Sequence, residues 1–212
     1  MRITFVTGNR HKVEEATAIL HDYDIEIMQN DCGYPELQDD DVAAIALYGA
    51  EHAANRLNHA VIVEDTGLYI DALNGFPGPY AAYVYDTIGN AGILTLMRGV
   101  DLRSATFRSV IGYCEPGMKP IAFEGAVTGR IADQEQGEGG FGYDPITEID
   151  GVTFASMGAE KNKVSHRGKS FTKFAEWFLG RGGIQDCGKM RENGEEMGRR
   201  QAIIGLEYNL QS

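Results

Sequence analysis

The stretch that most constrains the fold is AVIVEDTG, residues 60–67, in which four apolar residues lead into two acids, a threonine and a glycine. A short apolar run bounded by turn-forming residues is typical of a buried strand. We therefore expect a buried strand that ends at Glu64 and Asp65. Sheets that alternate with helices usually place their chemistry at the carboxyl ends of strands. The acid pair is a candidate functional site, and an exposed turn is the alternative interpretation.

The segments before this strand alternate between strand and helix patterns. RITFV, residues 2–6, is a short apolar run, and the residues after TGNRHK, residues 7–12, follow helical spacing with Val13, Ala16 and Leu20. DIEIM, residues 24–28, is a second strand candidate. A helix is expected from about Asp41, because aspartates suit a helix N-terminus and apolar residues then recur on one face.

The segments after the strand predict several further elements. LYIDALNG, residues 68–75, predicts a hairpin, and residues 105–132 alternate β-rich runs around Pro116 and Gly117, which predicts a second hairpin in a separate sheet or lobe. Aromatic residues at helical spacing predict a core-facing helix: Phe171, Phe174, Trp177 and Phe178. Residues 180–212 change in composition and are expected to form a C-terminal extension to a domain of residues 1–179.

Composition narrows the class of partner. The 212 residues carry a formal net charge of -12, which argues against a nucleic-acid binder that must neutralise phosphates over a broad basic face. A small anion is still allowed, because cations can be concentrated in one cleft. KNKVSHRGKSF, residues 161–171, is such a concentration, although a run of charges can also be a solvated surface. Without a signal-peptide pattern or an apolar run of about 18 residues, we expect a cytoplasmic protein that does not enter a membrane.

The junction TGNRHK offers a phosphate site. Small hydrogen-bonding residues at a helix N-terminus present N–H donors and a partial positive charge, and Lys12 adds a full charge one turn into the helix. Thr7 and Asn9 are also ordinary capping residues, so a plain capped helix explains the same stretch. Glu36, in YPELQ, and Asp65 supply oxygen ligands suited to Mg²⁺.

Two more stretches suit a nucleotide. GGFGYDP, residues 139–145, places Phe141 and Tyr143 beside Asp144, and aromatic rings can stack on a flat heterocycle while the acid accepts hydrogen bonds. A glycine-rich loop with aromatic anchors is the alternative. Neither common nucleotide motif holds: Lys163 stands where a P-loop needs glycine, and no strand leads into GEGGFG, residues 137–142. Taken together, the candidate stretches predict a nucleoside triphosphate site.

At this point the sequence resembles the inosine triphosphate pyrophosphatase family, most closely its archaeal members. The resemblance covers residues 1 to about 179 and is carried by TGNRHK, YPELQ, VEDTGLYIDALNGFPGPYAAYV, GGFGYDP and EKNKVSHRGK, in that order. It implies an α/β fold of two lobes around a long mixed β-sheet with flanking helices, an active-site cleft between the lobes, and a homodimer. It also implies Mg²⁺-dependent hydrolysis of ITP, dITP and XTP to the monophosphate and pyrophosphate.

The resemblance also assigns roles. Asp65 would activate the attacking water and contact Mg²⁺ with Glu36, and Thr66 would assist substrate binding. The phosphates would be gripped by Thr7, Gly8, Asn9, Arg10, His11 and Lys12. The base would be held by Phe141, Gly142, Tyr143 and Asp144, with Lys161 nearby, and its edge would be read by His166 and Arg167.

Three differences from relatives limit how far the roles of the family's residues can be assigned to this chain. Many relatives have basic residues where this chain has Gly49 and Ala82, and Ser156 stands where a glutamate is common. Two other functions are kept open. One is a house-cleaning pyrophosphatase for a different damaged nucleotide, such as a modified pyrimidine triphosphate. The other is a nucleotide-binding regulatory protein that has lost catalysis; retention of Glu36, Asp65 and Lys12 argues against it, because binding alone needs no water-activating base.

Overall fold

The structure is a computed structural model that describes residues 1–35 and 37–188. Residues Met1–Phe178 form one compact unit, and Leu179–Ser212 form a second, of which residues 189–212 lie outside the described part. The predicted extension of residues 180–212 falls entirely within this second unit and stays a prediction. No helix in residues 1–35 or 37–188 is long and apolar enough to span a membrane.

The first unit is built on one mixed sheet with the strand order β2-β1-β3-β5-β6-β7-β8, and β4 pairs with β3. The parallel pairs are β1 with β2 and β1 with β3, whereas all other pairs are antiparallel. The strands are β1 (Arg2–Val6), β2 (Glu26–Asn30), β3 (Val61–Ile70), β4 (Pro77–Gly78), β5 (Ser104–Cys114), β6 (Ile121–Ile131), β7 (Thr147–Ile149) and β8 (Val152–Thr153). The predicted α/β fold with a long mixed sheet is confirmed.

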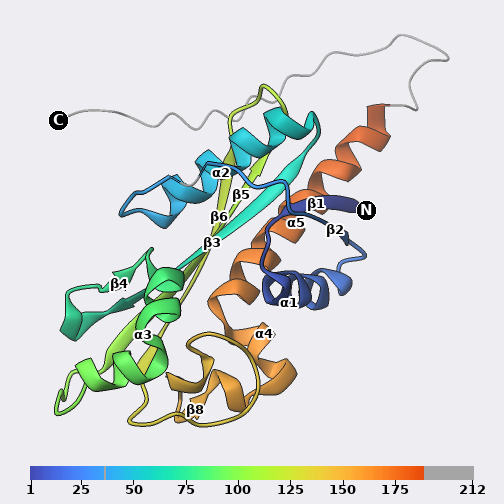
Figure 1. The fold of residues 1–212 in the computed structure, drawn as a ribbon. Coiled ribbons are helices and arrows are strands. Elements are labelled where there is room, and N and C mark those ends of the chain that lie inside the picture. Colours follow the sequence, from blue (N-terminus) through green and yellow to red (C-terminus); the bar gives the residue numbers. More distant parts are fainter. Residues whose placement is uncertain (36, 189–212) are drawn as a thin grey trace, which may run out of the picture. The chain divides into compact units, whose positions relative to one another are not determined.

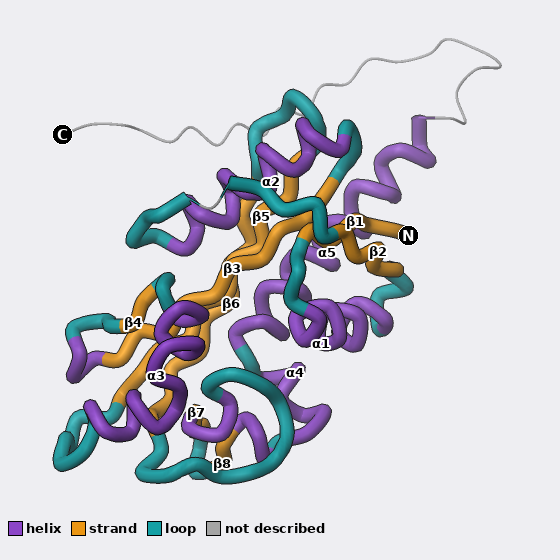
Figure 2. Tube along the Cα trace, in the orientation of Figure 1, coloured by secondary structure: helices purple, strands orange, loops and turns teal. Residues whose placement is uncertain are grey.

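Helices cover both faces of the sheet (Figures 1 and 2). They are α1 (Arg10–His21), α2 (Val42–Leu57), α3 (Ala81–Leu96), α4 (Lys161–Val164) and α5 (His166–Gly188). Helices α1 and α5 pack against Phe5 and Ile62 in one hydrophobic cluster that includes Phe171 and Phe174, as the aromatic spacing predicted. Helix α2 packs on the opposite face, against Val61 and Val63. A third cluster joins α3 to the far halves of β3, β5 and β6.

Helix α2 begins where the sequence places its cap. Asp41 is extended, and its carboxylate accepts a hydrogen bond from Ala43 N at 3.0 Å, so it satisfies one of the N–H groups that a helix start leaves unpaired. The helix ends at Asn58, which adopts the left-handed conformation that asparagine tolerates better than most residues.

Two expectations about strands are wrong. Strand β3 does not end at Glu64 and Asp65 but continues to Ile70, because β5 pairs with it along its whole length, from Val61 with Cys114 to Ile70 with Ala105. The chain turns only at residues 71–76 and then pairs through β4. For the same reason, β5 and β6 form the predicted hairpin but belong to the central sheet rather than to a separate one.

Candidate active site

Successive side chains of a strand point to opposite faces of its sheet, and this separates the two acids of β3. Glu64 lies on the face covered by α1 and α5, with its side chain fully buried, whereas Asp65 is half-buried and lines a cavity. The sequence placed these acids side by side as like charges. The alternation removes that conflict and gives each carboxylate its own surroundings.

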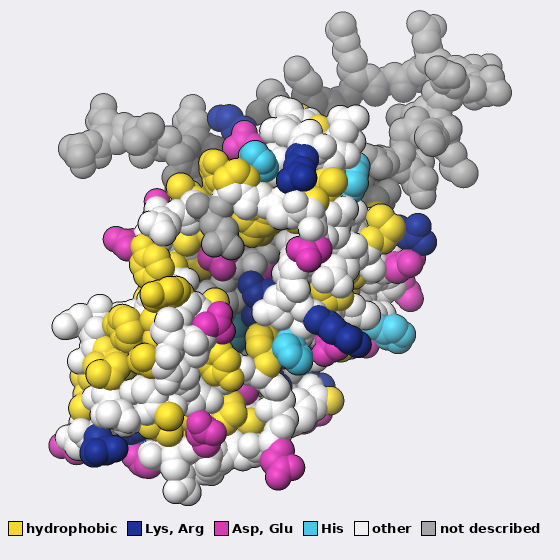
Figure 3. Space-filling view, viewed as in Figure 1, with side chains coloured by type: hydrophobic (Ala, Val, Ile, Leu, Met, Phe, Trp, Pro, Cys, Tyr) yellow, Lys and Arg dark blue, Asp and Glu magenta, His cyan; other side chains and the backbone are white. Residues whose placement is uncertain are grey.

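The cavity has a volume of about 420 Å³, in the range of pockets that hold small molecules. In Figure 3 this face of the molecule is hollowed near its centre, and basic side chains are visible inside the hollow. Most of the predicted site residues line the cavity: Asn9, His11, Lys12, Asp65, Thr66, Phe141, Gly142, Tyr143, Asp144, His166 and Arg167. Thr7, Gly8, Arg10 and Lys161 do not line it, and Glu36 lies outside the described residues.

The turn between β1 and α1 is held by its own side chains. Asn9 Oδ1 accepts hydrogen bonds from His11 N at 3.0 Å and Lys12 N at 3.2 Å, and Thr7 Oγ1 accepts one from Asn9 N at 3.1 Å. The plain capped helix is therefore present. It also brings Lys12 to the cavity, while the exposed Arg10 turns outward to Glu14.

Lys12 and Arg167 meet at one buried carboxylate. Lys12 Nζ lies 2.9 Å from Glu64 Oε2, and Arg167 Nε donates to Glu64 Oε1 at 3.2 Å. Burial alone would raise the pKa of Glu64, but the charges of Arg167 and Lys12, with hydrogen bonds from Ser109 and Thr66, lower it well below its usual range. Glu64 is therefore ionised at physiological pH.

A second carboxylate, Glu15 on α1, pairs with Lys161 and also with Arg167. It accepts a hydrogen bond from Lys161 Nζ and another from Arg167 Nη1 at 2.5 Å. Burial raises the pKa of Glu15, and the two cations outweigh it and lower the pKa below its ordinary value. Lys161 also donates to Asp144 Oδ2 at 2.6 Å, and Phe141 N donates to the same oxygen at 2.7 Å, which fixes the aromatic loop.

The cationic stretch of residues 161–171 divides in two. Lys161, His166 and Arg167 are buried, while Lys163 is exposed and pairs with Glu160. A solvated charge run is therefore the wrong interpretation for the buried half. The inward cations are balanced by carboxylates that the chain itself supplies: Lys12, Lys161 and Arg167 contact Glu15, Glu64 and Asp144.

The aromatic part of the site centres on Phe141. Its ring stacks on His11, with the ring centroids 5.1 Å apart and the planes 15° from parallel. Lys161 Nζ and Arg167 Cζ also lie over the ring, 5.1 and 5.3 Å from its centroid. Tyr143 is buried, and its hydroxyl donates to Ala81 O at 2.9 Å, so it anchors the loop to α3.

His166 begins α5 and is buried between Phe107 and Phe154, with ring centroids at 5.0 and 6.1 Å. Burial, and then the charge of Arg167, hold its pKa well below the ordinary value, so the imidazole is neutral at physiological pH. Its Nδ1 atom is buried and has no hydrogen-bond partner among the described residues. A neutral ring with an unsatisfied nitrogen suits recognition of a polar group on a ligand.

Sequence reasoning missed several residues of the site. Glu15 follows Lys12 by three residues and so shares its helix face, a spacing that could have placed Glu15 near the predicted phosphate site. Phe107, Tyr85 and Asp86 also line the cavity, and nothing local to their sequences marks them. Many relatives have a basic residue at the positions of Gly49 and Ala82. Ala82 lines the cavity, whereas Gly49 is buried against Tyr34 and does not line it.

The chain is similar to known proteins over most of its length. The model of the Ham1 family matches residues 3–177. A relative named dITP/XTP pyrophosphatase from Methanosarcina mazei is 54% identical over 180 residues, which are 84% of this chain and 98% of the relative. A relative of the same name from Methanopyrus kandleri is 55% identical over 181 residues, 84% of this chain and 96% of the relative.

Solved structures of Ham1 proteins are similar to this chain as well. The Ham1 protein of Staphylococcus aureus superposes with a TM-score of 0.73 at 30% identity, covering 85% of this chain and all of that one. The HAM1 protein of Coxiella burnetii gives a TM-score of 0.74 at 28% identity, over 84% of this chain and 98% of that one. Because the family model matches most of the chain and more than half of the aligned residues are identical in archaeal relatives, the chain belongs to the Ham1 family.

Proposed function

We propose that this protein hydrolyses non-standard purine nucleoside triphosphates, namely ITP, dITP and XTP, to the monophosphate and pyrophosphate. The observation that carries the proposal is the cavity of about 420 Å³, which has Lys12 and Asp65 in its lining together with the aromatic Phe141 and the donors of His166 and Arg167. One cavity thus offers a phosphate cation, a carboxylate base and a surface for a flat heterocycle. The names of the archaeal relatives support the same substrate class.

In the proposed reaction, water attacks the α-phosphorus, a new P–O bond forms, and the bond from the α-phosphorus to the bridging oxygen breaks to release pyrophosphate. Asp65 accepts the proton of the attacking water. Lys12 offsets the negative charge that develops on the departing oxygen. Its ammonium is held by Glu64, and Lys12 lines the cavity.

Discrimination follows from buried donors. A donor aimed at the 6-keto oxygen of hypoxanthine or xanthine meets an amino group in ATP and is left unpaired, which costs about 1–3 kcal/mol for each buried group. That cost corresponds to roughly tenfold to hundredfold selectivity per contact. Arg167 and the neutral His166 are buried donors in the cavity lining.

We also propose that Mg²⁺ assists, held by Asp65, by Glu36 and by the substrate phosphates. Mg²⁺ is commonly bound through one or two carboxylates plus phosphate oxygens rather than by an all-protein cage. Binding of this kind is consistent with the structure. Among residues 1–35 and 37–188, no group of three or more His, Cys, Asp or Glu side chains could hold an ion. Asp65, however, faces the cavity. When bound, the ion would supply positive charge to the polyphosphate.

The family resemblance supports a homodimer, a cytoplasmic location and small-molecule nucleotides rather than nucleic acid as substrates.

The test is product analysis with a panel of nucleoside triphosphates and Mg²⁺, in which pyrophosphate and orthophosphate are scored separately. We expect pyrophosphate from ITP, dITP and XTP and little from ATP or GTP. Cleavage of a modified pyrimidine triphosphate instead would assign the protein to a different house-cleaning reaction. Binding of ITP without hydrolysis would contradict catalysis and favour a regulatory role.

A further inference from the structure

Glu64 is a buried acid to which the proposed reaction gives no step, yet four side chains make polar contacts with its carboxylate. Its side chain has no exposed surface. Oε1 accepts hydrogen bonds from Thr66 Oγ1 at 2.5 Å, Ser109 Oγ at 2.6 Å and Arg167 Nε at 3.2 Å, and Oε2 lies 2.9 Å from Lys12 Nζ. This carboxylate therefore ties β3 to α1 through Lys12 and to α5 through Arg167.

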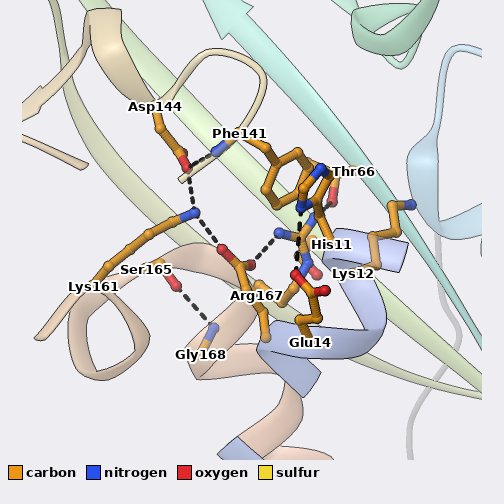
Figure 4. A network of polar contacts seen from close by, with 12 residues as sticks. His11, Lys12, Glu14, Thr66, Phe141, Asp144, Lys161, Ser165, Arg167 and Gly168 are labelled. Atoms are coloured by element: carbon orange, nitrogen blue, oxygen red, sulfur yellow. Dashed lines mark hydrogen bonds and ion pairs between the residues drawn. The ribbon is translucent and has the colours of Figure 1, made fainter. Parts of the chain in front are cut away.

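The two cations serve opposite ends of the proposed substrate. Lys12 belongs to the phosphate turn, and its ammonium also donates to the backbone oxygen of Glu64 at 2.9 Å. Arg167 lies over Phe141, on the base side, and its second acid is Glu15. Figure 4 shows Arg167 between Lys12 and Lys161, so the arginine is in the middle of the network rather than at its edge.

A shared buried carboxylate makes the positions of the two cations interdependent. In a region of low dielectric, removing one partner from a buried ion pair leaves a charge that must be compensated elsewhere. When a phosphate draws Lys12 away, Arg167 becomes the main counter-ion of Glu64 and is held more tightly. When an unsuitable base displaces Arg167, Lys12 becomes the main counter-ion and is drawn back from the phosphates.

We propose that Glu64 is a positioning residue that couples base recognition by Arg167 to phosphate binding by Lys12. The inference rests on the proposed function and deepens it, because it assigns part of the selectivity to a residue that touches no substrate. The coupling is reciprocal: engagement of the phosphates strengthens base reading, and a correct base strengthens the hold on the phosphates.

The test compares Glu64→Gln with Glu124→Gln, a matched control on β6 that removes the charge of an acid paired with Arg108 at 2.8 Å, outside the cavity lining. For each protein we would measure kcat and KM with ITP and ATP, inhibition by inorganic triphosphate, and the melting temperature. Inorganic triphosphate has no base, so it reports the phosphate end alone. Coupling between sites typically changes affinity about 5- to 150-fold.

We expect the ratio of kcat/KM for ITP over ATP to fall at least about tenfold in Glu64→Gln. Inhibition by inorganic triphosphate should not weaken, because Lys12 loses the carboxylate that competes with phosphate for it. Glu124→Gln should match the wild type in both. A general loss of structure would weaken inhibition as well, so it would not reproduce this pattern.

An unchanged ITP/ATP ratio, even with slower turnover, would overturn the coupling, because Glu64 would then hold each cation independently. If Glu64→Gln does not fold, Ser109→Ala decides, since it removes one donor to Glu64 and keeps every charge. In Ser109→Ala we expect a smaller fall in the ITP/ATP ratio of kcat/KM, with inhibition by inorganic triphosphate as in the wild type. No fall in this ratio would refute the inference. If wild-type protein releases no pyrophosphate from ITP, the proposed function fails and this inference with it, whereas an active wild type with an unchanged ratio defeats only the role of Glu64.

Discussion

Gly125, in the middle of β6, lies directly beneath the start of α5. A Cβ atom added there would be 2.1 Å from the carbonyl oxygen of His166 and 2.4 Å from the amide nitrogen of Ser170. Both are backbone atoms of a helix, so neither can rotate away. We predict that Gly125→Ala pushes the first turns of α5 off the sheet and moves the base-reading end of the site, although Gly125 itself is not in the cavity lining.

The size of the effect follows from the contact. Carbon–oxygen contacts settle near about 3.3 Å, so the helix must move by roughly 1 Å. Overpacking of this kind costs about 1–3 kcal/mol. For a domain of this size, each kcal/mol lowers the melting temperature by about 2–4 °C, which gives a loss of about 2–12 °C. Because His166 and Arg167 open α5, a displacement of about 1 Å should lower kcat/KM about a hundredfold.

The assay is a melting curve together with kcat/KM for ITP. Gly180→Ala is the control, because a Cβ there meets no described atom within 4 Å and alanine favours a helix by about 1 kcal/mol over glycine. We expect this control to be active and no less stable than the wild type. A Gly125→Ala protein that melts within about 1 °C of the wild type and turns over ITP normally would refute the argument.

Three further predictions can be tested with the same protein. Asp65→Asn should bind ITP nearly normally but hydrolyse it at least about a hundredfold more slowly; turnover near the wild-type rate would remove Asp65 from the role of base. Burial lowers the pKa of His166 in the folded protein, so only the unfolded chain protonates this imidazole as the pH falls below about 6.5. The free energy of unfolding should therefore fall by up to about 1.4 kcal/mol per pH unit between pH 6.5 and 5.5, and the same titration of His166→Gln should lack this slope. A chain that stops after Arg181 keeps the whole unit Met1–Phe178 and should retain the activity and melting temperature of the full chain; loss of either would show that the removed residues contribute to folding or assembly.

The sequence correctly predicted those features that depend on interactions between residues close together in the chain. The cap of α2 at Asp41 depends on a hydrogen bond between residues two apart, and the helical spacing of Phe171 and Phe174 places both on one face. The turn at Pro116 and Gly117 joins β5 to β6 for the same reason. These features were predicted, and the structure confirms them.

Long-range pairing accounts for what was predicted wrongly. The pattern of β3 suggested an end at Glu64 and Asp65, but the hydrogen bonds of β5 extend the strand to Ile70. Those partners lie about forty residues away in the chain, so the length of β3 is set by a neighbour that its own sequence does not contain. The same pairing placed the second hairpin in the central sheet.

The sequence by itself determined the family and the chemical character of the site, because motifs such as TGNRHK, GGFGYDP and KNKVSHRGK bring their polar groups together within a few residues. Only the tertiary structure decided which charges meet. Glu15 and Glu64 lie 152 and 103 residues from Arg167, yet both accept its hydrogen bonds. The physical reason is that a buried ion pair requires desolvation of both partners at one place, and that place exists only once α1, β3 and α5 have packed together.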